Sequence, residues 1–378
     1  MKFDTINISR LKVVVLIALA LSSCTEESSN EYLDNGIKKY DKGLYDKAIE
    51  LFTKSIELDS LNLEAYNYRG LSKEKKFDID GAISDYSTII SLDSNYHKAL
   101  NNRGIAYIEV GLFTKAVEDF NEAIVIKPEQ ADIYANRSIA KSRSGDFSGA
   151  LEDLKKAESI DPSEESIFRN RSIIYVNLND FDAALREINK SINLCPTNAV
   201  AYITRGSIKD YMKNYTDAIS DYDKAIELNP SIDLAYFNKA NTMLNIGNVA
   251  NAINLYNKAI SLNSNDYEYY FKRAYSKFIN GNNKGAITDF LYTIKMNPDY
   301  IDAYVFIGLA HYNLNNYDSA ISYYSKALLL NSNYAECYYN RGNAKFMIND
   351  RNGACLDWKK SLNLGFKDAN NIISKNCN

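Results

Sequence analysis

The amino-acid sequence repeats itself with a period of 34 residues, and this period constrains the fold more than any other feature. Segments such as YTDAISDYDKAIELNP, at 215–230, return with small changes along the chain. An alanine marks the same place in ten copies, at Ala48, Ala82, Ala116, Ala150, Ala184, Ala218, Ala252, Ala286, Ala320 and Ala354. A fixed period without insertions predicts an array of similar supersecondary units, each packed against its neighbours.

Two further positions keep a fixed size when the shared alanine is counted as position 20. Position 8 is always small, at Gly36, Gly70, Gly104, Ser138, Ser172, Gly206, Ala240, Ala274, Gly308 and Gly342. Position 24 is always large, at Phe52, Tyr86, Phe120, Leu154, Ile188, Tyr222, Tyr256, Phe290, Tyr324 and Trp358. Small residues on two antiparallel helices let the backbones approach, and a bulky residue fills the space beside that contact. All five prolines stand at position 32, which predicts a turn at the end of each copy.

This combination of period and residue size resembles the tetratricopeptide repeat (TPR) family. The resemblance implies an all-α fold, a right-handed α-α superhelix of ten 34-residue helix-turn-helix repeats over residues 31–366. A capping helix over residues 367–378 is expected to cover the apolar face of the last repeat. In proteins of this family, the first helices of successive pairs line a concave groove in which ligand peptides lie.

Positions 7 and 23 change together from copy to copy. Position 7 is arginine in seven copies, at Arg69, Arg103, Arg137, Arg171, Arg205, Arg273 and Arg341. Position 23 is acidic in the same copies, at Asp85, Asp119, Asp153, Glu187, Asp221, Asp289 and Asp357, and is Leu or Tyr in the other three. This co-variation predicts an arginine–carboxylate bridge, either between the two helices of a repeat or between adjacent repeats. An anion-binding row of arginines is the functional alternative.

The first 23 residues are expected to be a signal peptide. A basic stretch precedes an uncharged apolar run over 13–21, and nine residues of helix span about 14 Å, too little for a bilayer core of about 30 Å. The sequence LSSC at 21–24 resembles the lipobox of bacterial lipoproteins. This resemblance implies cleavage before Cys24 and lipidation of Cys24 by acyl chains such as palmitate. Ordinary signal cleavage beside an incidental cysteine is the alternative.

Residues 24–30 are expected to tether the repeats to the lipid anchor. Thr25 follows the cysteine in place of the aspartate that is linked to inner-membrane retention in lipoproteins. We therefore expect a lipid-anchored protein of the bacterial cell envelope, in the outer membrane. The sequence does not decide between its periplasmic and its surface side.

Charge and composition argue against several function classes. The net charge is -4, from 44 basic and 48 acidic residues, and no basic cluster is present to neutralise a row of phosphates. We expect no nucleic-acid partner. His97 and His311 lie far apart without acidic or cysteine companions at ligand spacing, so no metal site is expected. No nucleophile motif or phosphate-binding loop occurs, and we expect neither enzyme activity, catalytic residues nor a cofactor.

The residues expected in the groove change character along the chain. Those of repeats 2 to 5 are polar or small, at Asn67, Glu74, Lys75, Asn101, Glu109, Ala135, Arg143 and Arg169. Those of repeats 7 to 10 are apolar, at Phe237, Leu244, Phe271, Tyr275, Phe278, Tyr312, Tyr339, Phe346 and Met347. Large rings give contact area at low entropy cost, so the C-terminal half is predicted to bind an apolar or extended peptide. The alternative is that the family consensus tolerates tyrosine at positions 5 and 12 without any ligand, so that tyrosines there would not indicate a binding surface.

Four cysteines follow Cys24. The turn before the capping helix falls midway between Cys355 and Cys377, so the two are expected to face each other and to form a disulfide. Cys337 occupies a position usually held by alanine and is expected to be a small buried residue. Cys195 has no predicted role.

Two functions are compatible with these features. The first is a non-enzymatic scaffold tethered in the bacterial envelope, which presents its groove to a protein or peptide partner. The second is a structural or assembly factor of an envelope machine, for secretion, pilus or outer-membrane biogenesis, which uses its outer surface instead.

Overall fold

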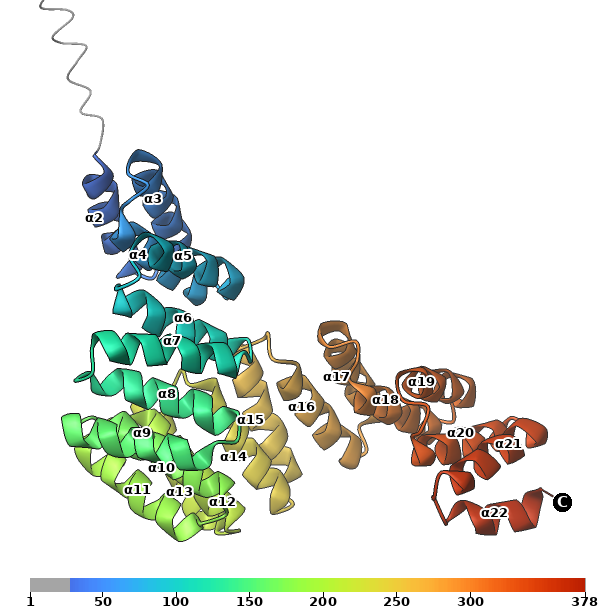
Figure 1. The fold of residues 1–378 in the computed structure, drawn as a ribbon. Coiled ribbons are helices and arrows are strands. Elements are labelled where there is room, and N and C mark those ends of the chain that lie inside the picture. Colours follow the sequence, from blue (N-terminus) through green and yellow to red (C-terminus); the bar gives the residue numbers. More distant parts are fainter. Residues whose placement is uncertain (1–27, 378) are drawn as a thin grey trace, which may run out of the picture. The chain divides into compact units, whose positions relative to one another are not determined.

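The computed structural model describes residues 28–377, and every regular element in that range is a helix (Figure 1). Helices α2 to α21 form ten consecutive pairs, which confirms the predicted all-α repeat fold. The first helix of a pair is called helix A here and the second helix B. The expected signal peptide over 1–23 and the lipidated Cys24 lie outside the described residues.

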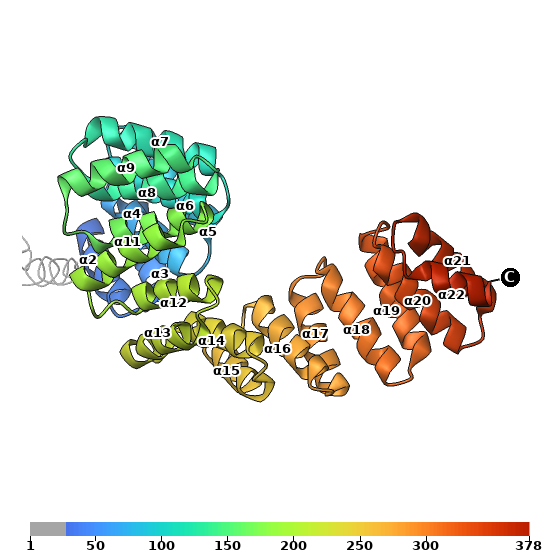
Figure 2. The ribbon, with the colours of Figure 1, turned by 90° about the horizontal axis from the view of Figure 1, so that it is seen from below.

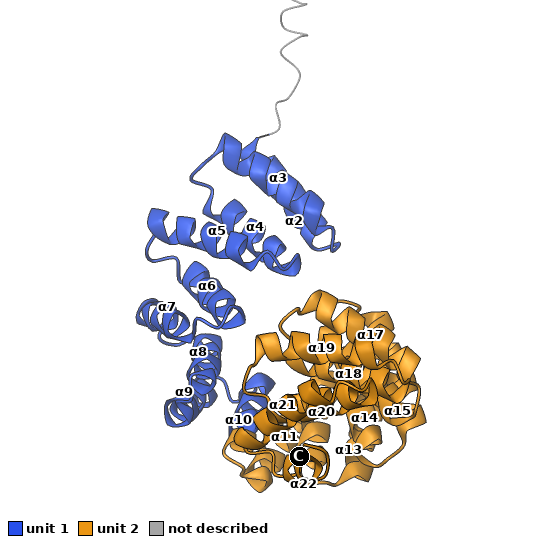
Figure 3. Ribbon diagram, turned by 90° about the vertical axis from the view of Figure 1, so that its right-hand side faces the viewer, with its two compact units in different colours: residues 1–174 blue, residues 175–378 orange. Residues whose placement is uncertain are grey.

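The chain divides into two compact units, residues 1–174 and residues 175–378 (Figure 3). Unit 1 contains α2 (Ser29–Tyr40), α3 (Tyr45–Leu58), α4 (Leu63–Lys75), α5 (Ile79–Leu92), α6 (His97–Glu109), α7 (Phe113–Ile126), α8 (Ala131–Arg143) and α9 (Phe147–Ile160). Helix α10 (Glu165–Asn177) crosses the boundary between the units.

Unit 2 continues with α11 (Phe181–Leu194), α12 (Ala199–Tyr211), α13 (Tyr215–Leu228), α14 (Asp233–Asn245), α15 (Val249–Leu262), α16 (Tyr267–Ile279), α17 (Asn283–Met296), α18 (Ile301–Asn313), α19 (Tyr317–Leu330), α20 (Ala335–Met347), α21 (Arg351–Asn363) and α22 (Ala369–Asn376). Within each unit, consecutive helices pack against one another along the chain (Figures 1 and 2).

The contact between helices A and B is built as the residue sizes predict. The alanine at position 20 is fully buried in all ten copies, and the large residue at position 24 is at most 1% exposed. The small residue at position 8 is needed because the bulky side chain lies against it. A Cβ atom added to Gly70, for example, would lie 2.6 Å from Cε1 of the Tyr86 ring. Overpacking of this kind costs about 1–3 kcal/mol per site.

The turn between helices A and B requires one residue with positive φ. That residue stands at position 15 in all ten copies, at Gly43, Phe77, Gly111, Gly145, Asn179, Lys213, Gly247, Gly281, Asn315 and Asn349. Glycine and asparagine adopt this conformation at low cost, whereas residues such as Phe77 and Lys213 are strained by it. This rule was not predicted from the sequence.

The predicted arginine–carboxylate bridge is confirmed in six repeats. The Nη2 atom of position 7 lies 2.6–2.7 Å from the position 23 carboxylate of the same repeat in Arg69–Asp85, Arg103–Asp119, Arg137–Asp153, Arg205–Asp221, Arg273–Asp289 and Arg341–Asp357. The carboxylates are nearly buried. These six arginines are therefore committed to the fold and do not form a free anion-binding row. The seventh predicted pair, Arg171 and Glu187, joins residues of different units and stays a prediction.

The same arginines also connect neighbouring repeats. Nη1 of each donates to position 25 of the preceding repeat, at distances of 2.6–3.2 Å, to Thr53, Ser87, Asn121, Asn189, Asn257 and Ser325. A lysine at position 11 adds a second cation to five of the carboxylates, at 2.7–2.9 Å, from Lys73, Lys141, Lys209, Lys277 and Lys345. In these six repeats the carboxylate bridge therefore joins the two helices of one repeat, and the link to the preceding repeat is a hydrogen bond to a neutral side chain.

Repeat 3 replaces this arrangement with an equivalent one. In other repeats the arginine lies over the aromatic ring at position 4, as Arg69 lies 5.3 Å from the centroid of Tyr66. Position 4 of repeat 3 is Leu100, and there Arg103 lies 5.7 Å from the ring of Tyr107, which occupies the place of the position 11 lysine. In repeat 3 the aromatic ring beside the arginine thus comes from position 11 and not from position 4. Arg103 still donates to Asp119.

The last helix covers the end of unit 2. Helix α22 packs on α21, the final helix B. The structure joins Cys355 of α21 to Cys377 through a disulfide, with Cα atoms 5.6 Å apart. Cys337 is fully buried, as expected, and burial raises the pKa of its thiol to about 12. Cys195 is a free thiol that is half-buried.

Candidate functional site

The A-helix face of unit 2 is the surface formed by α12, α14, α16, α18 and α20. Each of these is the first helix of its repeat, and successive members contact each other directly. The apolar residues expected in the groove all lie on α14 to α20. They therefore belong to one continuous layer of helices within a single unit.

Two of the expected groove residues are mainly core residues. Phe237 is 7% exposed, and its ring stacks on Tyr269 with centroids 4.5 Å apart. Phe271 is 8% exposed and meets the ring of Tyr300 at 4.8 Å. Each ring fills the space between its own helix and the next repeat, so it offers little area to a ligand. The one-dimensional pattern cannot separate this packing role from a binding role, because both favour a large ring at position 5.

Tyr275 and Phe278 of α16 are half-buried around one central ring. Both pack edge-on against Phe306 of α18, with centroids 5.3 and 5.6 Å away. Phe306 is itself stacked on Phe290 at 5.6 Å. This cluster holds α16 and α18 together and leaves part of Tyr275 and Phe278 accessible.

The remaining expected residues are also half-buried, with one exception. Tyr312, Tyr339 and Phe346 contact the rings of Tyr317, Phe366 and Trp358, at 5.3, 5.0 and 5.6 Å. Leu244 packs at the edge of the core around Tyr256. Met347, at the end of α20, is 47% exposed and is open to a partner.

The C-terminal ends of the A helices carry a further set of apolar residues, which we call the apolar rim. It comprises Tyr211, Met212, Ile246, Ile279, Met347 and Ile348, which are 40–66% exposed. The corresponding positions of repeats 2 to 4 in unit 1 are mainly polar, at Lys75, Lys76, Glu109, Arg143 and Ser144, with Val110 as the exception. The rim extends the predicted apolar gradient to position 14, which the sequence analysis did not consider.

A second feature that was not predicted from the sequence is a hydrogen bond between positions 9 and 24. Tyr222 donates to Ser207 at 3.3 Å, Tyr256 to Asn241 at 2.6 Å, and Trp358 to Asn343 at 3.0 Å. Where position 9 is Leu71, the hydroxyl of Tyr86 donates instead to Glu74, at 3.1 Å. A polar residue at position 9 together with a donor at position 24 was the signal that could have revealed these bonds.

Asp210, near the end of α12, lacks such a donor. Its Oδ1 atom is buried and accepts no hydrogen bond from the described residues. Burial raises the pKa of this carboxyl group, while Thr242 and Asn245 of α14 lower it by hydrogen bonding. The adjacent Lys209 is held by Asp221, 2.7 Å away on α13. Asp210 is therefore a partly buried acidic group that forms no ion pair with the described residues, and its burial favours the protonated form.

The polar groove residues of unit 1 are more fully paired. Asn67 and Asn101 accept from Asn102 and Asn136 of the following A helices, both at 3.0 Å. Burial, and to a lesser degree the charge of Glu109, raises the pKa of Glu74 to about 7, although the Tyr86 hydrogen bond opposes the shift. These contacts join successive A helices, which is a structural role.

The described part of the chain shows neither a membrane-spanning helix nor a metal-binding cluster. No helix between residues 28 and 377 has both the length and the apolar character needed to cross a membrane. The same residues include no cluster of three or more histidine, cysteine or acidic side chains placed to hold a metal ion.

Models of the tetratricopeptide repeat match four segments of the chain, at residues 97–130, 199–232, 221–254 and 301–334. Three of these segments coincide with the third, sixth and ninth copies in the register set by the alanines. The segment at 221–254 begins inside a helix B and ends inside the next one. No curated protein sequence matches this chain.

Solved structures with similar folds include two that resemble most of this chain's length. The human IFIT1 dimer with m7Gppp-AAAA is 14% identical over 90% of this chain and 91% of that one, with a TM-score of 0.56. The C-terminal part of a TPR repeat-containing protein from Cytophaga hutchinsonii is 18% identical over 61% of this chain and 95% of that one, with a TM-score of 0.52. At these identities the likeness concerns the fold alone.

Proposed function

The chain is a tetratricopeptide repeat protein, and on that premise we propose that it is an interaction scaffold whose partner binds the A-helix face of unit 2. Proteins with these repeats are generally non-enzymatic scaffolds that bind protein or peptide partners. The observation that carries the proposal is the apolar rim, together with the half-buried rings of α16, α18 and α20. Exposed apolar side chains gathered on one face are typical of binding surfaces.

Variants in the rim test this proposal without disturbing the core. Tyr211→Ser, Ile279→Ser and Met347→Ser change side chains that are 66%, 46% and 47% exposed on three A helices. Combined in one protein, they are expected to abolish capture of a partner from the native membranes. Phe271 is unsuitable for this purpose, because it is 8% exposed and its replacement would disturb packing.

A matched control lies on the B helices. Tyr292→Ser, Leu329→Ser and Leu356→Ser change side chains that are 48%, 86% and 70% exposed on α17, α19 and α21. This triple variant is expected to retain the partner. These exposed B-helix residues favour the alternative function, an assembly factor that uses its outer surface. Loss of the partner in the control, with retention in the rim variant, would establish that alternative and refute ours.

The proposal includes a lipid anchor that tethers the scaffold in the bacterial envelope, at the outer membrane. Its support is the sequence alone, namely the LSSC motif that ends at Cys24 and the short apolar run before it. Several acyl chains together anchor a protein stably, since each buried CH₂ contributes about 0.8 kcal/mol. Metabolic labelling with a palmitate analogue should mark the wild type and not Cys24→Ser, and the variant should leave the membrane fraction. Equal labelling of both proteins would contradict the anchor.

A further inference from the structure

Repeat 1 carries an open cavity of about 340 Å³, formed by α2, the turn after it and α3. A volume of this size is typical of small-ligand sites. The cavity is lined by Asn35, Lys38, Lys39, Lys42 and Leu51, none of which is acidic. Lys38 and Lys42 are exposed and Lys39 is half-buried, and none of the three forms an ion pair with a described residue. The cavity is therefore accessible from solvent and carries uncompensated positive charge.

The equivalent place in other repeats shows what repeat 1 lacks. In five repeats the lysine at position 11 binds the aspartate at position 23, with Nζ 2.7–2.9 Å from the carboxylate. In repeat 1, position 11 is Lys39, but position 23 is Leu51 and position 7 is Asn35. The other two repeats without the arginine–carboxylate pair have Met243 and His311 at position 11. Repeat 1 alone keeps the lysine without its carboxylate.

The cavity faces the side of α2 that a preceding repeat would cover. Each later helix A packs on the helix B before it, as α4 packs on α3. Position 7 marks this side, because the arginine there donates to the preceding repeat, as Arg69 does to Thr53. Asn35 holds position 7 of repeat 1 and lines the cavity. No helix B precedes α2 among residues 28–377, so a partner can approach Lys39 from this side.

We propose that this cavity binds the carboxylate of an aspartate or glutamate side chain on a partner protein that packs against the open side of α2. Lys39 supplies the charge-assisted hydrogen bond that its counterparts make inside their own repeats. The side-chain amide of Asn35 is a second donor. Leu51 gives an apolar wall for the methylene stem of the acidic side chain, which favours a side-chain carboxylate over a free inorganic anion. This surface belongs to unit 1, and its binding can be tested apart from that of the A-helix face of unit 2.

Peptide selection by the full-length protein tests the site. The probe is a pooled library of decapeptides with alanine and leucine flanks and a central glutamate or glutamine. We expect the wild type to favour glutamate by about tenfold, the usual scale for one charge-assisted hydrogen bond. Lys39→Gln should remove this preference. Lys47→Gln, which removes an equal charge at an exposed position of α3, should keep it.

Leu51→Asp provides a second test in which the cavity is filled from within the repeat. The change restores the aspartate that accompanies the position 11 lysine in five other repeats, so Lys39 gains an internal partner. The preference for glutamate should disappear, while circular dichroism should show the same helix content as in the wild type.

Several results would overturn the proposal. The first is equal binding, or no binding, of the glutamate and glutamine peptides by the wild type, and the second is a preference that survives in Leu51→Asp. Displacement of the peptides by inorganic phosphate as readily as by glutarate would identify a general anion site. Stronger peptide binding after Glu26→Gln and Glu27→Gln would show that the chain's own acidic segment fills the cavity. Self-association, or binding to vesicles of anionic phospholipid, that depends on Lys39 in place of peptide binding would assign the cavity to a second copy or to a membrane.

Discussion

The hydroxyl of Tyr222 donates to Ser207 at 3.3 Å, and this one hydrogen bond separates repeat 6 from repeat 2. In repeat 2 the equivalent hydroxyl, that of Tyr86, donates to Glu74. The two repeats share their helices, their arginine bridge and their buried tyrosine. They differ in whether the acidic residue at position 12 accepts from that hydroxyl: Glu74 does, whereas the Oδ1 atom of Asp210 is buried and accepts no hydrogen bond from the described residues.

The pKa of Glu74 predicts how the stability of repeat 2 depends on pH. Its folded-state pKa, about 7, lies above the usual value of 4.5, so the folded state binds the proton more tightly than the unfolded state. The stabilisation from this group is therefore complete below pH 4.5 and is lost as the pH rises through about 7. Hydrogen exchange of α4 and α5, corrected for intrinsic rates, should show less protection at pH 8 than at pH 5.5.

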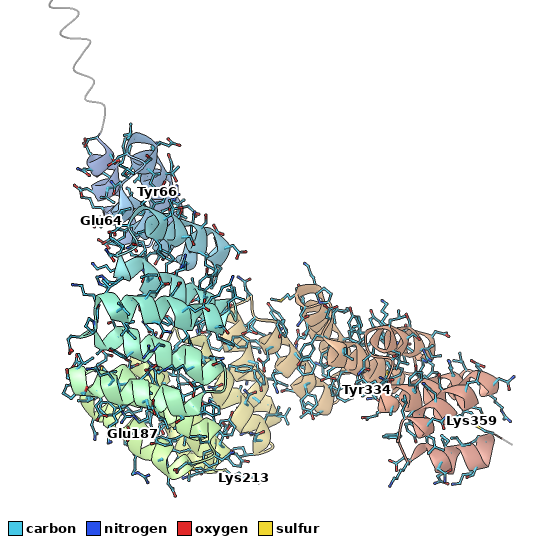
Figure 4. All side chains as sticks on the ribbon, in the orientation of Figure 1. Glu64, Tyr66, Glu187, Lys213, Tyr334 and Lys359 are labelled. Carbon is cyan, nitrogen blue, oxygen red and sulfur yellow. A yellow bond between two sulfur atoms is a disulfide. The ribbon has the colours of Figure 1, made fainter. Side chains whose placement is uncertain are left out.

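Glu74→Gln should remove most of that pH dependence, because glutamine does not titrate and still accepts from Tyr86. Glu64→Gln is the control, since Glu64 is exposed on the same helix (Figure 4). An unchanged pH profile in Glu74→Gln would show that another group is responsible.

The cations around Asp221 predict a large effect of one substitution. Asp221 is 4% exposed and binds both Arg205 and Lys209. Asp221→Asn should destabilise unit 2 by about 3 kcal/mol, since two mostly buried cations lose their counter-charge. Asp223→Asn should cost less than about 1 kcal/mol, because that carboxylate pairs with Lys239 at the surface. Thermal unfolding of the two variants measures the difference, and equal melting temperatures would contradict the structural role of the bridge.

The turn rule at position 15 predicts two stabilising changes. Phe77 and Lys213 have φ of 62° and 61°, where five other copies carry glycine. Phe77→Gly and Lys213→Gly should each stabilise the protein by about 1 kcal/mol through relief of backbone strain. Lys213→Ala should give no gain, because alanine is strained in the same way. A rise in melting temperature for alanine equal to that for glycine would refute strain as the cause.

The disulfide between Cys355 and Cys377 should hold the capping helix. Reduction, or Cys377→Ser, frees an eight-residue helix whose packing among the described helices is mainly on α21. By loop-entropy arguments a crosslink over this separation contributes about 3 kcal/mol. Hydrogen exchange should become fast in α22 and stay slow in α19 and α20. Persistent protection of α22 in Cys377→Ser would show that its packing suffices without the bond.

Much of this architecture was predictable because the same residue pattern occurs in ten copies of the repeat. The period, the buried alanine and the co-variation of positions 7 and 23 each gave a structural rule that six or more copies obey. The groove was harder to predict, because Phe237 and Phe271 occupy groove positions and yet turn into the packing between repeats. Asp210 was missed for a related reason. Its Oδ1 atom is left without a donor because the Tyr222 hydroxyl, on the next helix, donates to Ser207, and the sequence does not state which acceptor that hydroxyl takes.

Hydroxyl-radical footprinting of the captured complex shows which helix face the partner covers, because tyrosine and methionine react readily when exposed. Partner binding should protect Tyr211 and Met347 on the A helices and leave Tyr292 and Leu329 on the B helices as reactive as in the free protein. Protection of Tyr292 and Leu329, with Tyr211 and Met347 still fully oxidised, would contradict binding to the A-helix face and place the partner on the outer surface.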